Sequence, residues 1–378
     1  MLDGHTYRLS QSLARRQMPS WRTADFHKLI RAFGSFPQDT QSLSELWEMM
    51  DTMQEFRFDD YMREAGGLSA ADLERFVEAM ADIVIFQRMH MPDVPARLPF
   101  STMISALAVY NKLCAYHPNF KTVLEIGPGC GYTSLFLKGH EALENYAQVE
   151  VCEAFYLLQN AINCVSFPAR FAEHAFPPRG AMNAFTTDSV FTESTDVVAD
   201  PFPPKCSHYP WWKLGDIANG ASKFDIVTTN ATMMEMHTQA LMDYLATTAR
   251  VLKDDGVMVS QCLGGEMVTT REQLRRILFH TGFAPLVYIE GLGTKTMVDP
   301  ETRQDVQFHL PVNLGVFIRK GHPLFERYYH REHYDSDFIA GEEFVRHALC
   351  PPKVPRSFYS RAELTEMVKD RLKIRLAG

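Results

Sequence analysis

The chain contains 378 residues, of which 46% are hydrophobic and 22% are charged, a composition typical of globular proteins. Its formal net charge of −8 argues against nucleic acid and against an anionic membrane surface as a partner. No apolar run is long enough to cross a bilayer, and the N-terminal segment lacks the apolar stretch of a signal peptide. The seven cysteines include no Cys-x-x-Cys pair, so we expect reduced thiols and a cytoplasmic location.

The first hundred residues show the periodicity of helices. Ser42 opens a capping-box signature, and apolar residues follow at helical spacing until Gly66. Ser69 opens a second helix that continues to about Pro92, and Ser101 is the expected cap of a third. Residues 1–100 are therefore predicted to form an N-terminal helical cap, which would be suited to closing over a substrate.

A glycine-rich stretch follows in the middle of the chain. Residues 123–126 form a short apolar run of the kind that a buried parallel strand needs. Gly127, Gly129 and Gly131 come next and let the backbone turn sharply, close to a ligand, because no Cβ intervenes. Residues 132–137 are predicted to open a helix, whose free N–H groups would face that ligand.

The spacing of these glycines differs from the dinucleotide-binding fingerprint. That fingerprint has Gly or Ala three residues after its second glycine, where this chain has Tyr132. Glu125 stands two residues before the first glycine. An acid followed by Gly-x-Gly-x-Gly after an apolar strand resembles the first motif of class I S-adenosylmethionine (SAM) dependent methyltransferases. The resemblance implies that SAM is the cofactor and that Glu125 and the three glycines lie at its site.

A second strand is predicted over residues 147–152 and ends at Glu153. This acid lies 22 residues after Gly131 (153 − 131 = 22). An acid at the tip of the second strand of a doubly wound sheet can accept hydrogen bonds from ribose hydroxyls, and about 20 residues is the usual separation. The alternative is a solvated acid that starts a helix over residues 154–165, where the helix dipole also favours a negative charge. We prefer the ribose role because strand, spacing and residue type agree.

Residues 166–204 interrupt this alternation of strands and helices. They are rich in proline, and we interpret them as an insertion near the substrate-binding end of the sheet. A third strand is predicted at residues 207–209, followed by Trp211 and Trp212. The tip of the third strand is where this fold meets the adenine ring, so either tryptophan could stack there. Burial of both rings in the ordinary core is the open alternative.

The remaining strands complete the predicted sheet. A fourth strand spans residues 224–230 and a fifth spans 257–260, with amphipathic helices between and after them. Two closing strands are predicted at 283–289 and 314–318. Two strands after five strand–helix units resemble the methyltransferase sheet, in which the last strand inserts antiparallel. The predicted fold is therefore a doubly wound, Rossmann-like, seven-stranded α/β domain over residues 101–320.

Within that class, the chain resembles the sugar O-methyltransferase family. The resemblance rests on residues 124–131, 209–211 and 230–236. It implies SAM binding at the glycine loop and Glu153, and an acceptor near Asn230 and Glu235. Members of the family often carry an Asn-(x)4-Glu-Met pattern after the fourth strand, usually followed by Pro, where this chain has His237. That departure and the length of the insertion concern the acceptor rather than the cofactor.

Transfer of a methyl group to a hydroxyl needs a group that accepts the proton. Glu235 and His237 are the candidates, because they follow the fourth strand, at whose carboxyl end ligands bind. Asn230 offers an amide that could orient the acceptor hydroxyl or the amino group of SAM. The alternatives are helix capping for Glu235 and a surface imidazole for His237.

The C-terminal extension, residues 321–378, offers no defined site. Residues 330–337 hold two His and two Asp, but their spacing matches no known metal site, so we interpret them as a polar loop. Ser360 is predicted to cap a final helix, which could pack on the core or form a homodimer contact.

Three functions remain open at this point. The preferred one is a SAM-dependent methyltransferase that acts on a hydroxyl of a small metabolite, such as a sugar. The second is another SAM-consuming enzyme that methylates nitrogen, or uses the amino-acid arm of SAM and releases methylthioadenosine. The third is a SAM-binding protein without catalytic activity.

Overall fold

The computed structural model describes most of the chain. The described residues are 2–18, 40, 42–175, 204–263, 268–290, 293–298, 303–310, 314–330, 337–344 and 354–377. Most of the predicted insertion (176–203) and most of the polar loop interpreted in the tail (331–336) lie outside them.

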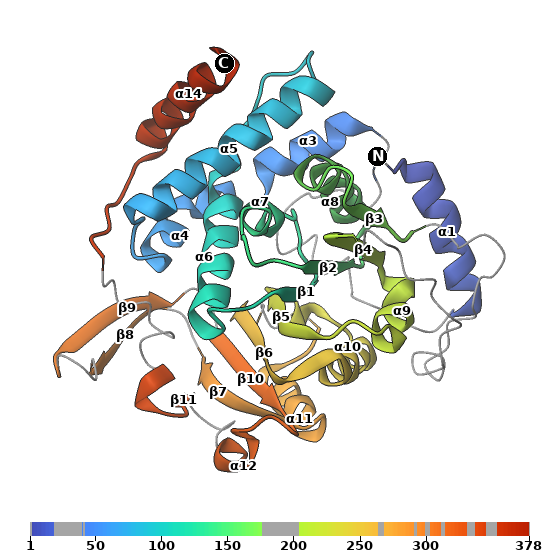
Figure 1. The fold of residues 1–378 in the computed structure, drawn as a ribbon, viewed down its shortest axis with the longest axis vertical. Coiled ribbons are helices and arrows are strands. Elements are labelled where there is room, and N and C mark those ends of the chain that lie inside the picture. The colour runs from blue at the N-terminus through green and yellow to red at the C-terminus, as the bar shows by residue number, and fades with distance from the viewer. Residues whose placement is uncertain are drawn as a thin grey trace.

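One large sheet organises the molecule (Figure 1). Its strand order is β11–β7–β10–β6–β5–β1–β2–β4–β3. The strands are β1 (Thr122–Ile126), β2 (Asn145–Glu150), β3 (Phe171–Glu173), β4 (Cys206–Pro210), β5 (Phe224–Asn230), β6 (Leu252–Cys262), β7 (Phe283–Ile289), β10 (Leu314–Arg319) and β11 (Phe338–Ile339). Strands β8 (Gly293–Val298) and β9 (Asp305–Leu310) form a separate antiparallel pair.

The seven predicted strands are present in the predicted order. They are β1, β2, β4, β5, β6, β7 and β10, and β10 lies antiparallel between β6 and β7. The prediction of seven strands was incomplete, because β3 extends the sheet beyond β4 and β11 extends it beyond β7. These edge strands have three and two residues, too few to show a period of alternation in the sequence.

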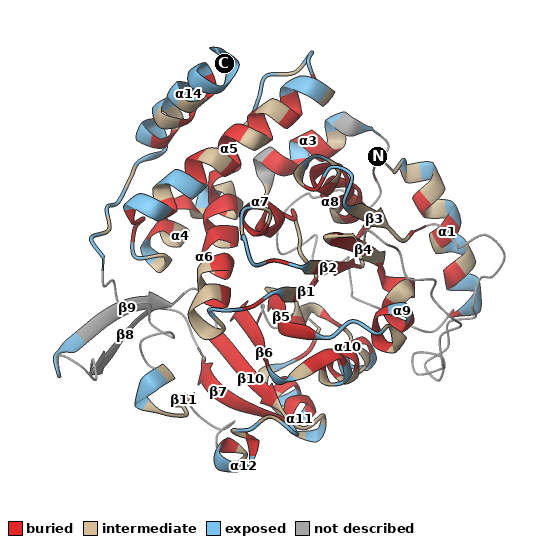
Figure 2. Cartoon of the chain, viewed as in Figure 1, coloured by how far each residue is buried: buried red, intermediate tan, exposed pale blue. Residues whose placement is uncertain are grey.

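Helices cover both faces of the sheet, as a doubly wound fold requires. Figure 1 shows α6 (Phe100–Tyr116), α7 (Thr133–Leu137) and α8 (Glu153–Ser166) on one face. On the other face are α9 (Leu214–Asn219), α10 (Thr238–Val251) and α11 (Arg271–His280). The central strands are buried on both sides (Figure 2), which explains their nearly continuous apolar sequences.

The N-terminal segment is helical, but its elements differ in part from the prediction. It contains α1 (Gly4–Gln17), α3 (Leu43–Thr52), the 3₁₀ turn η1 (Glu55–Arg57), α4 (Phe58–Glu64) and α5 (Ala70–His90). The single helix predicted from Ser42 to Gly66 is broken, because Gln54 adopts the left-handed conformation with φ +56°. Ser42 and Ser69 cap α3 and α5 as predicted.

Ser101 is not the cap of α6, as the sequence suggested. The cap position of α6 is Pro99, two residues before Ser101, and the helix begins at Phe100. Ser101 instead contacts η1, because its backbone N–H donates to the Glu55 carboxyl (3.0 Å) and its hydroxyl donates to the Glu55 carbonyl (3.2 Å). The helical segment is thereby joined to the face of the sheet that α6 covers.

The C-terminal helix α14 (Arg361–Ala377) lies along α5 (Figure 1). Its buried residues Leu364, Val368 and Leu372 face the rest of the chain. Ion pairs from its basic side chains to Glu78 and Asp82 of α5 flank this apolar contact. The predicted helix therefore packs within its own chain.

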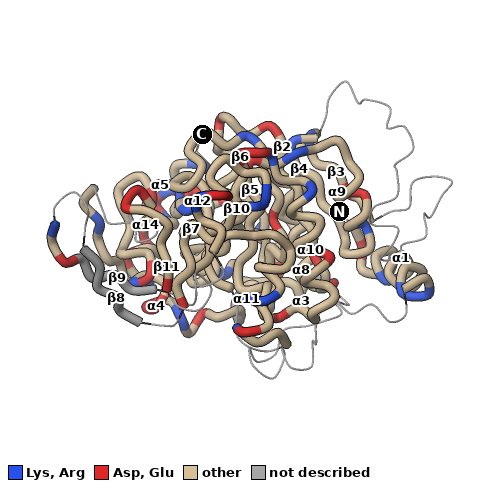
Figure 3. Tube along the Cα trace, turned by 90° about the horizontal axis from the view of Figure 1, so that it is seen from below, with Lys and Arg blue, Asp and Glu red and all other residues tan. Residues whose placement is uncertain are grey.

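One hydrophobic cluster extends from Tyr7 to Leu372 and includes residues from all three predicted segments. Acidic and basic residues are interspersed along the described trace (Figure 3). The six cysteines in the described residues are free thiols. Within the same residues, no helix combines the length and apolar character needed to cross a membrane.

Candidate functional site

The glycine loop joins β1 to α7 at the carboxyl end of the sheet. Gly127, Gly129 and Gly131 all have positive φ, at +66°, +59° and +76°. A Cβ on Gly127 would lie 2.6 Å from the Thr232 side chain, and one on Gly131 would lie 2.7 Å from the Gln159 side chain. A Cβ on Gly129 would meet nothing within 4 Å. Gly127 and Gly131 are thus required by packing, whereas Gly129 faces open space in which a ligand can approach the backbone.

Helix α7 contributes less than the sequence suggested. It has only five residues, all of them buried. The predicted contact between the N–H groups of a longer helix and a ligand therefore finds no support in this element.

Glu125 lies under the loop, not at its surface. The residue is 2% exposed, and its carboxyl accepts hydrogen bonds from the hydroxyls of Thr133 (3.0 Å) and Tyr146. Burial raises the pKa of this carboxyl to about 7, although the hydrogen bonds lower it. Glu125 thus ties β1 to α7 and to β2, and its predicted place in the cofactor site stays a prediction.

The acid at the tip of the second strand is Glu150. It is the last residue of β2 and lies 19 residues after Gly131 (150 − 131 = 19). Its Oε2 accepts hydrogen bonds from the Gly129 backbone N–H (3.3 Å) and from Gln159 Nε2 (2.9 Å). Its Oε1 accepts the two N–H groups that follow the strand, at 2.7 and 3.0 Å. The carboxylate therefore stands directly beside the open face of the loop.

Glu153, the acid predicted for this position, has a different environment. It is the first residue of α8, and its carboxylate accepts hydrogen bonds from Arg8 (2.5 Å) and from the Thr40 backbone N–H (3.2 Å). Strand β2 ends two residues before the end of the predicted strand (152 − 150 = 2), because the Glu150 carboxylate holds the next two N–H groups in a turn. Glu153 thus fastens the N-terminal segment to α8.

Trp211 and Trp212 follow β4 in the 3₁₀ turn η3 (Trp211–Lys213). Their rings meet edge to face at 5.5 Å, and Trp211 is only 2% exposed. Residues of α1 cover the pair, with Arg15 lying 5.8 Å from the Trp211 ring and Tyr7 lying 5.1 Å from the Trp212 ring. The structure favours the core-packing alternative over stacking on an adenine.

The segment after β5 lies against the glycine loop. Asn230 ends the strand, and its amide donates to Ser105 of α6 (3.2 Å). Ala231 takes a left-handed conformation, with φ +54°, and turns the chain back. The Thr232 hydroxyl then donates to the Asn230 carbonyl (2.8 Å), while its side chain fills the space that Gly127 leaves free. This turn holds Asn230 at the same edge of the sheet as Gly129 and Glu150.

Glu235 and His237 follow this turn. Burial, together with the negative charge of Glu150, raises the pKa of Glu235 to about 8. Within the described residues, the Glu235 carboxyl makes no hydrogen bond or ion pair. His237 is the N-cap residue of α10 but does not cap it with its side chain. Its Nε2 is buried without a hydrogen-bond partner among the described residues, but the residue as a whole is only partly buried, so both the catalytic role and the surface-imidazole alternative stay open.

Three further residues at the loop were missed in the sequence. Glu150 was read as strand interior, and Gln159 was read as an ordinary helix residue. Glu55 of the helical segment lies near enough for its charge to raise the pKa values of Cys130 and Tyr132, after the larger effect of burial. Of these three residues, only Glu150 could have been found from the sequence, because it lies 19 residues after Gly131, close to the usual separation of about 20.

Comparisons with known proteins add little to this geometry. No family model and no curated protein matches the chain. Its fold is similar to that of a TehB-like SAM-dependent methyltransferase from Corynebacterium glutamicum, at 12% identity and a TM-score of 0.35, over 56% of this chain and 88% of that chain. It is also similar to CalS10, an amino pentose methyltransferase from Micromonospora echinaspora, at 13% identity and a TM-score of 0.33, over 57% and 90%.

A third similar structure is the magnesium protoporphyrin IX methyltransferase of Synechocystis PCC 6803. The identity is 12% and the TM-score 0.32, over 66% of this chain and 97% of that chain. At such scores these likenesses carry no argument about activity. The Rossmann-like fold class follows from the strand order of the chain itself.

Proposed function

We propose that this chain is a SAM-dependent methyltransferase that acts on a hydroxyl of a small metabolite, with sugars as one candidate class. The observation that carries the proposal is the arrangement at the carboxyl end of the sheet. Gly129 presents open backbone there, Glu150 stands beside it, and the Asn230–Glu235 segment lies against the same loop. Ligands of open α/β sheets bind at this edge.

The residues at this edge fit SAM. The ribose hydroxyls need an acceptor at the tip of the second strand, and Glu150 supplies a carboxylate there. The Gly129 backbone leaves room for the nucleoside to approach. The ligand is cationic at its sulfonium, and the Glu150 carboxylate, which accepts four hydrogen bonds, places negative charge at this edge. When bound, SAM supplies a methyl group that is already electrophilic.

The chain itself must hold the acceptor in line and accept its proton. Holding two reactants in place can contribute on the order of 7–11 kcal/mol. Glu235 is the preferred base, because a carboxyl with a pKa of about 8 accepts a proton far more readily than an ordinary one. His237 is the second candidate, and Asn230, oriented by Ser105, is placed to hold the acceptor hydroxyl. The helical segment 1–100 is joined to α6 through the hydrogen bonds between Ser101 and Glu55, and we propose that it covers this end of the sheet.

Binding of S-adenosylhomocysteine tests the proposal by calorimetry. Gly129→Ala places a Cβ where the ligand must approach, so we expect affinity to fall at least about tenfold. Gly66→Ala is the matched control, because Gly66 has a similar φ (+66°) and equally open surroundings but lies between α4 and α5. Both variants suffer the same left-handed strain, about 1–2 kcal/mol. Equal affinity of both variants, or binding of NAD by the wild type, would contradict the proposal.

A second candidate is another SAM-consuming reaction on the same fold. An ammonium acceptor must lose a proton before its nitrogen can attack the methyl group, and Glu235, once ionised, could accept that proton, which is consistent with methylation of nitrogen. Use of the amino-acid arm of SAM is a further alternative. Mass spectrometry of the nucleoside product separates these routes, since methyl transfer leaves S-adenosylhomocysteine and transfer of the amino-acid arm leaves methylthioadenosine.

A further inference from the structure

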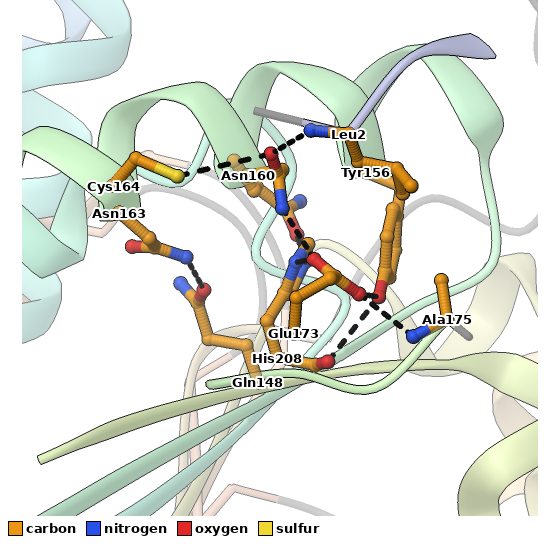
Figure 4. Close-up of polar contacts among 10 residues, drawn as sticks. Leu2, Gln148, Tyr156, Asn160, Asn163, Cys164, Glu173, Ala175 and His208 are labelled. Atoms are coloured by element: carbon orange, nitrogen blue, oxygen red, sulfur yellow. Dashed lines mark hydrogen bonds and ion pairs between the residues drawn. The ribbon is translucent and has the colours of Figure 1, made fainter. Parts of the chain in front are cut away.

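A chain of buried polar side chains lies directly behind the glycine loop. Gln159 of α8, His208 of β4 and Glu173 of β3 are linked in that order. Gln159 and His208 are fully buried, at 0% exposure. Figure 4 shows Glu173 between His208 of the sheet and Tyr156 and Asn160 of α8. The fold has gathered these groups from three elements, and the roles assigned above use none of them.

The orientation of the Gln159 amide is fixed by its neighbours. Its Nε2 lies 2.6 Å from the Gly129 carbonyl oxygen and 2.9 Å from Glu150 Oε2. Both partners can only accept hydrogen bonds, so the amide nitrogen must face them. The amide oxygen consequently faces His208 Nε2, at 2.9 Å, and that nitrogen must carry a proton.

Glu173 holds the His208 ring in this orientation. Its carboxylate lies 3.2 Å from His208 Nδ1, and the Tyr156 ring stacks on the imidazole at 3.9 Å. Burial raises the pKa of Glu173, but His208 and the Tyr156 hydroxyl outweigh it and hold this pKa below the ordinary value. Glu173 is therefore held as a carboxylate, and its Oε2 lies within hydrogen-bond distance of His208 Nδ1. His208 then presents Nε2–H to Gln159.

Gln159 is the side-chain donor that remains on Glu150 when a ligand reaches it, beside the backbone N–H groups of Val151 and Cys152. The four hydrogen bonds to Glu150 occupy all the lone-pair directions of its carboxylate. The Gly129 N–H contact is the longest of them, at 3.3 Å, and is the one that a ligand hydroxyl can replace. Gln159 also packs under Gly131 and bonds the Gly129 carbonyl. It thus joins the acid to the loop on the side away from the ligand.

We infer that Gln159 is a positioning residue of this site, which holds the Gly129 backbone and the Glu150 carboxylate in register, and that His208 sets the direction of its amide. The inference rests on the proposed function in that SAM is taken as the ligand. The claim that Gln159 holds the loop and Glu150 in place needs no ligand and rests on the contacts of the structure alone. Ligand binding and the rigidity of the loop can therefore be measured separately.

Replacement of the amide tests the role directly. Gln159→Leu keeps the volume but removes both donors, so we expect affinity for S-adenosylhomocysteine to fall at least about tenfold. Gln87→Leu is the matched control, because Gln87 is equally buried but bonds the Arg97 backbone and the Trp47 indole, not the glycine loop or Glu150. Thermal unfolding of both variants reports the general cost of losing a buried amide.

Hydrogen exchange of the backbone amides measures how firmly the glycine loop is held in place when no ligand is bound. Residues 127–132 should exchange faster in Gln159→Leu than in the wild type, and at the wild-type rate in Gln87→Leu. Unchanged exchange in Gln159→Leu would overturn the positioning role, even if the variant were less stable. Wild-type affinity in Gln159→Leu would overturn it as well. Absence of S-adenosylhomocysteine binding by the wild type would instead overturn the proposed function, while exchange would still decide the positioning role.

Two further variants separate positioning from simple packing. In Gln159→Glu, a protonated carboxyl can still donate to Glu150, whereas an ionised one repels it while still accepting from His208. Its affinity should therefore fall relative to wild type as pH rises from 5 to 8, which a packing role would not produce. His208→Leu should reproduce the loss seen in Gln159→Leu, and His208→Gln, which keeps a donor, should recover most of it. A flat pH profile, or equal losses in both His208 variants, would overturn the inference.

Discussion

The buried position of Glu235 predicts that the free energy of unfolding depends on pH in a specific way. The pKa of its carboxyl rises from an ordinary 4.5 to about 8 in the folded chain, because burial and then the Glu150 charge disfavour ionisation. The folded state therefore binds more protons than the unfolded state between these two values. By linkage, the contribution of Glu235 to stability falls as pH rises from about 4.5 to about 8 and is constant outside that window.

Replacement of Glu235 by Gln should remove this dependence. A shift of this size corresponds to at most about 5 kcal/mol, and the partial exposure of the residue should reduce it to about 1–3 kcal/mol. Chemical denaturation at pH 5 and pH 8.5 should therefore show Glu235→Gln gaining stability relative to wild type at the higher pH. Glu141→Gln, at an exposed acid, serves as the control and should follow the wild type. Parallel curves for Glu235→Gln and wild type would refute the reasoning.

Two further predictions concern the roles of the acids and the histidine. Glu150→Ala should weaken binding of S-adenosylhomocysteine more than Glu153→Ala does in calorimetry, because only Glu150 stands beside Gly129, and the reverse order would restore the original assignment. With a competent acceptor, Glu235→Gln should lower turnover by roughly 10²–10⁴-fold while SAM affinity is kept, and turnover should rise with pH as Glu235 ionises. Full activity in Glu235→Gln with none in His237→Ala would identify His237 as the base.

The sequence predicted those elements whose cause is local. Strands β5 and β7 match their predicted bounds, because each is a compact apolar run with clear ends. Ser42 and Ser69 cap α3 and α5, the helices that they were predicted to begin. The glycine loop was found in the sequence because three of its five residues adopt a left-handed backbone conformation, which glycine adopts more readily than any other residue. For these features, neighbouring residues contain the whole physical reason.

The errors arose where distant residues decide the structure. The sequence after Glu150 continues with Val151 and Cys152, which look like more strand, but the Glu150 carboxylate turns the chain by binding their N–H groups. The sequence also could not indicate the ion pair of Glu153, because its partner, Arg8, lies 145 positions away. No periodicity in one stretch can reveal such a pairing.

The supporting groups of the site show the same limit. Gln159 and His208 are separated by 49 positions, and neither stands in a recognisable motif. The α6 helix begins earlier than predicted because Ser101 bonds Glu55 across the helical segment. These contacts form between residues that are distant in the sequence and are brought together only by the fold. Sequence patterns therefore indicate where a ligand binds more readily than what holds the binding groups in place.

The central claim is that a SAM-derived ligand lies on Gly129 and Glu150, with its reactive end toward Asn230 and Glu235. A crystal structure of the chain with S-adenosylhomocysteine tests this most directly. We predict density for the ribose hydroxyls within hydrogen-bond distance of the Glu150 carboxylate, with the sulfur facing the segment after β5. A ligand bound elsewhere would contradict the claim. So would a ribose bound to Glu153 while the Glu150 carboxylate still accepts the Gly129 N–H.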